Sequence, residues 1–124
     1  MQSHVLIVDD EAPIREMLRV ALERQHYRVT DVSSTAEAFR VARENPPDLV
    51  ISDLQLEESD GLEMITGLKD LRPNMPVLLL TGVVFDARAI ESALGSKISS
   101  YLHKTASLSA IVAEVKRLIG EPKA

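Results

Sequence analysis

Short apolar runs alternate with longer segments of helical periodicity along this chain. The apolar runs are continuous, which is typical of strands that are covered on both faces. Strands that alternate with helices in this way predict βαβ units and a parallel sheet. We place the predicted strands near residues 4–9, 27–32, 48–53, 76–81 and 98–103.

The first and last predicted helices have the clearest apolar stripes. Pro13 suits the first turn of a helix that runs to about Gln25. Apolar residues three or four positions apart predict its buried face, namely Ile14, Met17, Leu18, Ala21 and Leu22. The same spacing near the end of the chain predicts a helix that buries Leu108, Ile111, Val112, Val115 and Leu118.

Capping signals mark the starts of the other helices. Ser34 and Glu37 have the spacing of a capping box, and Asp60 and Glu63 repeat it. Asp86 is expected to cap a short fourth helix. The chain therefore contains five strand-helix units.

Five such units in 124 residues predict one α/β domain. The expected architecture is a doubly wound five-stranded parallel sheet, (βα)5, with the flavodoxin-like strand order 2-1-3-4-5. Strands 1 and 3 are then neighbours, and a crevice opens beside strand 1 at the carboxyl edge of the sheet. We expect a single domain over residues 1–124, without an output domain.

The amino-acid composition argues against several classes of protein. Hydrophobic residues make up 45% of the chain and charged residues 27%, which is ordinary for a globular protein. The net charge of -5 and the lack of a dense basic cluster argue against direct nucleic-acid binding. The absence of cysteine excludes disulfides and thiolate zinc sites. No apolar run is long enough to span a bilayer, and the N-terminus lacks a signal peptide pattern, so we expect a soluble, cytoplasmic protein.

Polar residues follow four of the predicted strands at the point where each one ends. Asp9 and Asp10 follow the first strand, Asp53 ends the third, Thr81 ends the fourth and Lys104 follows the fifth. These groups meet at one edge of a parallel sheet, where α/β proteins build their sites. Three carboxylates in close contact raise one another's pKa unless a cation compensates, and Mg²⁺ is the expected cation.

The same residue types suit a phosphoryl transfer. A carboxylate such as that of Asp53 can act as a nucleophile and form an aspartyl phosphate. Lys104 can hold a second phosphoryl oxygen, and the hydroxyl of Thr81 can donate to a third. The sequence therefore predicts a divalent-metal and phosphoryl site.

This arrangement resembles the receiver domain of bacterial two-component response regulators (CheY-like), over essentially the whole chain. The residues that carry the resemblance are Val5 to Glu11, Asp48 to Asp53 with Asp60-Gly61 downstream, Thr81-Gly82, and Tyr101 to Lys104.

The resemblance implies a role for each matching residue. Asp53 is the position that accepts a phosphoryl group from a sensor histidine kinase or a histidine phosphotransfer protein. Asp9, Asp10 and Asp53 help bind Mg²⁺, together with the backbone carbonyl of Gln55, and Mn²⁺ is an acceptable substitute. The resemblance thus implies a phosphoprotein that is not an enzyme beyond promoting its own phosphorylation and dephosphorylation.

It also implies a switch. Residues at the positions of Thr81 and Lys104 contact the phosphoryl group, and an aromatic at the position of Tyr101 turns inward as the threonine moves. The surface of helix 4, strand 5 and helix 5 then changes and contacts a downstream protein or an output domain. A homodimer through this surface is compatible with the family.

Three positions depart from the family pattern. Glu57 and Thr105 stand where the family usually has proline, and Lys97-Ile98 replaces a usual Gly-Ala pair. We expect a trans Lys104–Thr105 bond, because a cis bond is rare without proline.

Other functions on a similar fold fit less well. A haloacid-dehalogenase-type phosphatase, with an aspartate nucleophile and Mg²⁺, needs Asp-x-Asp after strand 1, but Asp9 and Asp10 are adjacent. A flavodoxin-like cofactor binder needs a phosphate loop where this chain has Asp-Glu-Ala-Pro. A phosphorylation-independent interaction module would show an eroded acidic site, and none of the acids is missing.

Overall fold

The structure is a computed structural model that describes residues 3–53, 61–81 and 98–120, without the side chains of residues 61, 62 and 81. Its centre is a five-stranded parallel sheet in the order β2-β1-β3-β4-β5. This order confirms the predicted flavodoxin-like topology. The strands are β1 (His4–Val8), β2 (Arg28–Val32), β3 (Leu49–Ser52), β4 (Val77–Thr81) and β5 (Ser100–His103).

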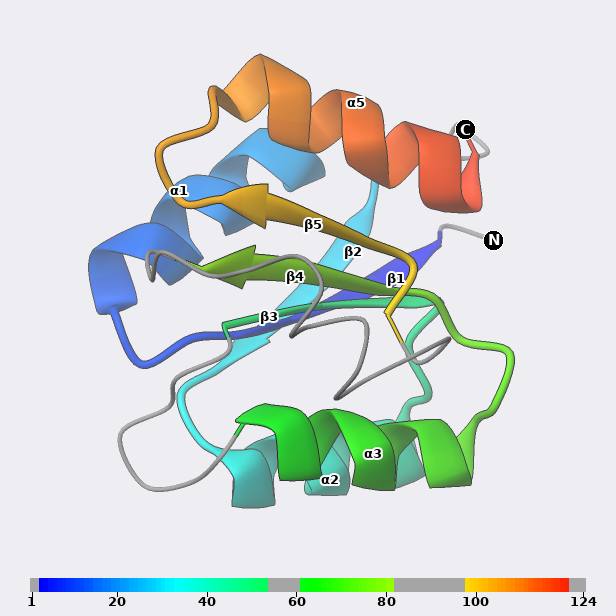
Figure 1. Cartoon of the computed structure of the whole chain (residues 1–124). Coiled ribbons are helices and arrows are strands. Elements are labelled where there is room, and N and C mark those ends of the chain that lie inside the picture. Colours follow the sequence, from blue (N-terminus) through cyan, green and yellow to red (C-terminus); the bar gives the residue numbers. More distant parts are fainter. Residues whose placement is uncertain (1–2, 54–60, 82–97, 121–124) are drawn as a thin grey trace.

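Helices cover both faces of the sheet (Figure 1). The described helices are α1 (Ala12–Glu23), α2 (Thr35–Glu44), α3 (Gly61–Leu71) and α5 (Leu108–Ile119). α1 and α5 lie on one face, and α2 and α3 lie on the other. The predicted fourth helix and its cap at Asp86 lie outside the described residues.

The central strand β1 explains why the apolar runs are continuous. All of its residues are buried. Val5 and Ile7 pack towards α1 and α5, whereas Leu6 and Val8 pack towards α2 and α3. Because the side chains of a strand alternate between faces, a strand covered on both faces favours a continuous apolar run such as Val5 to Val8. Burial of each such side chain contributes about 2 kcal/mol.

Local signals explain where two helices begin. Ser34 precedes α2, and its hydroxyl accepts a hydrogen bond from the backbone amide of Glu37 at 3.3 Å. This contact confirms the predicted cap. Ser107 caps α5 in the same way through the amide of Ala110, at 3.1 Å. The predicted cap at Asp60 lies outside the described residues.

The predicted buried stripes were wrong at two positions. Met17 is 37% exposed and Leu108 is 38% exposed. Met17 lies about 100° around α1 from the buried Leu18, so it is turned away from the sheet. Leu108 is the first residue of α5 and lines a surface groove between α1 and α5. α1 also ends at Glu23, slightly before its predicted end.

Candidate functional site

Asp9 and Asp53 meet at the carboxyl edge of the sheet. The amide of Asp9 donates to the carbonyl of Val32 at 3.2 Å, and the amide of Asp53 donates to the carbonyl of Val8 at 3.2 Å. These bonds continue the parallel ladder beyond the ends of β1 and β3. Both aspartates are buried, with exposed fractions of 2% and 6%.

Four carboxylates form a cluster at this edge. One carboxylate oxygen from each of Asp9, Asp10, Glu11 and Asp53 lies within 4.8 Å of the others. Oxygen ligands of Mg²⁺ lie about 2.1 Å from the metal, so opposite ligands are about 4.2 Å apart. The cluster is therefore close to the size that a single hard cation requires. Its donors are all oxygens, which suits Mg²⁺.

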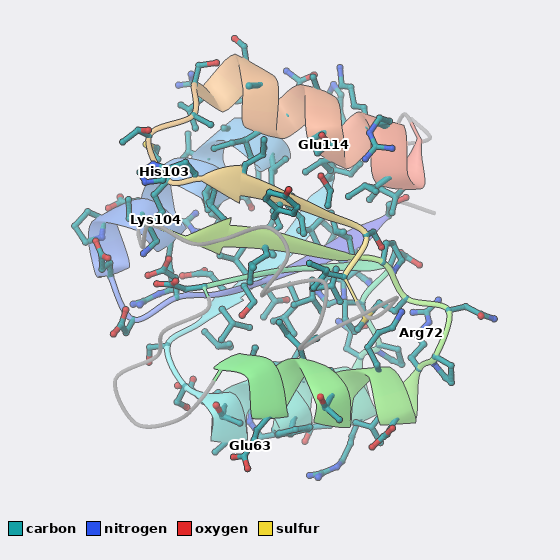
Figure 2. All side chains as sticks on the ribbon, viewed as in Figure 1. Glu63, Arg72, His103, Lys104 and Glu114 are labelled. Atoms are coloured by element: carbon teal, nitrogen blue, oxygen red, sulfur yellow. The ribbon has the colours of Figure 1, made fainter. Side chains whose placement is uncertain are left out.

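Lys104 reaches into this cluster from the segment that follows β5 (Figure 2). Its Nζ lies 3.0 Å from Oδ2 of Asp9, 2.9 Å from Oδ2 of Asp53 and 2.8 Å from Oε1 of Glu11. The Lys104 side chain is only 12% exposed. One ammonium therefore faces three carboxylates at the mouth of the site.

The pKa directions of Asp9 and Lys104 reflect their burial and their hydrogen bonds. Burial raises the pKa of Asp9, and this effect exceeds the opposite effects of the Glu11 amide and of Lys104. Burial alone would lower the pKa of Lys104, but hydrogen bonds to Glu11, Asp53 and Asp9 raise it above its ordinary value. Lys104 therefore stays protonated beside these carboxylates.

The structure brings together Asp9, Asp10, Asp53 and Lys104, as the sequence predicts. Glu11 is a member of the cluster that the sequence analysis did not single out. Its position directly after the two aspartates was the available signal.

The other predicted site residues are placed only in part. Thr81 ends β4 and pairs with His103 of β5, but its side chain is not described. Tyr101 pairs with Leu79, and its side chain is 37% exposed. Gln55, the proposed source of a backbone carbonyl ligand, lies outside the described residues, as do Glu57 and Lys97.

Two further expectations concern the backbone and the membrane. The described residues contain no cis peptide bond, so the Lys104–Thr105 bond is trans as predicted. No helix in the described part of the chain combines the length and apolar character needed to cross a bilayer.

Comparison with known proteins gives one family match. The model of the response regulator receiver domain family matches residues 5–116.

Two curated relatives illustrate the sequence likeness. The transcriptional regulatory protein SrrA of Staphylococcus aureus is 33% identical over 119 residues, which covers 96% of this chain and 48% of SrrA. The transcriptional regulatory protein GlrR of Escherichia coli is 38% identical over 89 residues, which covers 70% of this chain and 20% of GlrR. The chain thus spans about half or less of the length of these relatives.

Solved structures share the fold. A response regulator receiver domain protein from Clostridium thermocellum has a TM-score of 0.84 and 27% identity, with 94% of each chain covered. A CheY-like receiver domain protein from Methanospirillum hungatei has a TM-score of 0.89, with 98% of this chain and 96% of that chain covered. The second is 23% identical and supports the fold alone.

Proposed function

This chain belongs to the response regulator receiver domain family, and we propose that it acts as a phosphoacceptor in two-component signalling. A receiver domain is a signalling module of a response regulator. In the proposed reaction, Asp53 takes a phosphoryl group from a sensor histidine kinase or a histidine phosphotransfer protein. We assign residues 1–124 to this single domain, with no enzymatic activity beyond its own phosphorylation and dephosphorylation.

The contact between Asp53 and Lys104 is the observation that most supports phosphoryl transfer to Asp53. The ammonium lies 2.9 Å from Oδ2 of a carboxylate that is only 6% exposed. In the transfer, a carboxylate oxygen of Asp53 attacks phosphorus, and the bond from phosphorus to the donor's histidine nitrogen breaks. The nitrogen keeps that electron pair. Lys104 is already beside the nucleophile, so it can pass to a phosphoryl oxygen as negative charge arrives.

The acid cluster supports a requirement for Mg²⁺. Asp9, Asp10, Asp53 and the backbone carbonyl of Gln55 would hold the ion. Bound there, Mg²⁺ supplies the positive charge that offsets the transferred phosphoryl group. The close approach of the four carboxylate oxygens is the observation that favours a cation at this position.

The proposed switch joins Thr81 to Tyr101. The hydroxyl of Thr81 would donate to a phosphoryl oxygen, and Tyr101 would turn inward from the partly exposed position that it has on β5. This movement would change the surface of helix 4, β5 and α5, which we propose contacts a downstream protein, an output domain or a second copy of the chain. The two curated relatives are transcriptional regulatory proteins, which makes an output domain that controls transcription a partner class to test.

Intact mass after incubation with acetyl phosphate and MgCl₂ tests the phosphorylation. We expect the mass of one phosphoryl group to be added to the wild type and not to Asp53→Asn. A matched control is Asp70→Asn, which removes an exposed carboxylate of α3 and should be phosphorylated like the wild type.

Two results would contradict the proposal. One is phosphate mapped to Asp9 or Asp10 of the unmutated protein. The other is undiminished phosphorylation in excess chelator, since the unneutralised carboxylates should repel an incoming phosphoryl anion.

A further inference from the structure

Arg15 joins three elements beside the acid cluster. It lies in the first turns of α1, and its Nη1 donates to the backbone carbonyl of Asp9 at 2.6 Å. Its Nε pairs with Oδ2 of Asp31, on β2, at 3.3 Å. The Arg15 side chain is only 18% exposed. The contacts therefore connect the end of β1 to both α1 and β2.

The carbonyl that Arg15 contacts belongs to the peptide bond between Asp9 and Asp10. The rest of Asp9 is held separately, because its amide donates to Val32 and its Oδ1 accepts from the amide of Glu11 at 2.8 Å. Arg15 fixes the remaining backbone polar group of Asp9, its carbonyl. Rotation of this peptide would turn the backbone of Asp10 and move its carboxylate away from the cluster.

We propose that Arg15, anchored by Asp31, is a positioning residue for cation binding. It holds the Asp9–Asp10 peptide so that both carboxylates converge on one point. This inference rests on the proposed function, because it assumes that the acid cluster binds Mg²⁺.

The direction in which a substitution of Arg15 changes the affinity for Mg²⁺ distinguishes a positioning role from a purely electrostatic effect of its charge. Arg15 is a cation near the cluster, so removal of its charge alone should strengthen Mg²⁺ binding. Removal of a positioning contact should weaken it, as loss of a group that orients metal ligands usually does. The two readings therefore predict opposite changes of the dissociation constant.

Arg19 provides a matched control. Its Nε lies 3.5 Å from Oδ1 of the same Asp31, and it also lies on α1. Its other ion pair is with Glu23 of the same helix, at 3.1 Å. Arg15→Met and Arg19→Met thus remove the same charge and the same partner, but only the first removes the contact to the Asp9 carbonyl.

Calorimetric titration with MgCl₂ measures the effect. We expect Arg15→Met to weaken Mg²⁺ binding about tenfold. Arg19→Met should change it by less than about twofold, because exposed charges are screened. Asp31→Asn should weaken binding by less than Arg15→Met, because the carbonyl contact stays while its anchor is lost. Thermal melting in chelator reports any general loss of stability, which a purely structural role would produce without the change in affinity.

Any other result of the titration overturns either the positioning role of Arg15 or the proposed function. Arg15→Met that binds Mg²⁺ as tightly as the wild type, or more tightly, overturns the positioning role and leaves the proposed function intact. A wild type that does not bind Mg²⁺ overturns the proposed function itself. If Arg15→Met does not fold, Asp31→Asn replaces it, and wild-type affinity in Asp31→Asn overturns the inference.

Discussion

The residue with the widest influence on the site is Lys104. Its ammonium contacts carboxylates from the end of β1, the start of α1 and the end of β3. Buried acids need a partner, and removal of that partner leaves their repulsion uncompensated. Lys104 therefore stabilises the acid cluster as well as serving the proposed transfer.

Lys104→Met should lower the free energy of unfolding in chelator by roughly 1–3 kcal/mol. Added Mg²⁺ should then raise the melting temperature of this variant by more than that of the wild type, because the cation replaces the lost positive charge. Thermal melts with EDTA and with MgCl₂ measure both effects. Lys69→Met is the control, since that ammonium binds the carbonyl of Met75 far along the chain from the acids. An equal response to Mg²⁺ in the wild type and Lys104→Met would contradict the prediction.

The positions of polar groups at the ends of strands could be predicted, whereas contacts that depend on how far a long side chain reaches could not. Asp9, Asp10 and Asp53 were predictable because the ends of parallel strands share an edge. The role of Glu11 was not, because the sequence does not reveal that Lys104, 93 positions later, turns back towards it. An exposed glutamate at the start of a helix is usually an ordinary solvated charge.

Among the elements, α2 and α3 pack closely together at Gly67. A Cβ atom added to Gly67 of α3 would lie 2.5 Å from Cζ of Phe39 on α2. Glycine is a poor helix former, so Gly67 by itself weakens α3. The structure adds the reason for its presence, which is that the phenylalanine ring occupies the place of a side chain.

Gly67→Ala therefore sets two effects against each other. Alanine gains about 1 kcal/mol of helix propensity, whereas overpacking costs about 1–3 kcal/mol. We expect net destabilisation in urea unfolding. Phe39→Leu removes the ring, and in that background Gly67→Ala should become neutral or stabilising. A gain of stability in the wild-type background would show that the ring moves aside easily.

The buried faces of the helices were harder to predict than the strands. The strands follow from continuous burial on two faces, and their predicted positions were confirmed to within one or two residues. The exposure of Leu108 depends on the groove between α1 and α5 that it lines, and the exposure of Met17 depends on how α1 is turned on the sheet. That relation is a tertiary fact, which an apolar repeat in one helix does not contain.

At the scale of the whole molecule, we expect His4 to make the free energy of unfolding depend on pH. It is fully buried on β1, and its Nε2 lies 2.8 Å from the hydroxyl of Thr30. Its Nδ1 is buried and has no hydrogen-bond partner among the residues that the structure describes. Burial lowers the pKa of His4, and Arg28 lowers it further, whereas Asp48 acts in the opposite direction.

Stability should consequently fall as the pH falls below about 6.5, the ordinary pKa of histidine. The unfolded chain takes up the proton first, while folded His4 remains neutral, so acid favours unfolding by up to about 1.4 kcal/mol per pH unit until the folded pKa is reached. Urea unfolding between pH 7 and pH 5 measures this slope. His4→Gln should reduce it, and His26→Asn, at an exposed position with φ of 70°, should not. An unchanged slope in His4→Gln would remove His4 as its cause.

The contact between Lys104 and the acid cluster also has a consequence for biosynthesis. A ribosome makes Asp9, Asp10, Glu11 and Asp53 well before it makes Lys104. A nascent chain that lacks β5 can already bring β1 and β3 together, yet it has no ammonium from Lys104 for their carboxylates. Docking of the last strand then closes the sheet at its edge and delivers that charge in one step. The segment of β5 and Lys104 thus supplies, late in synthesis and before α5 is made, a positive charge that offsets the repulsion within the acid cluster.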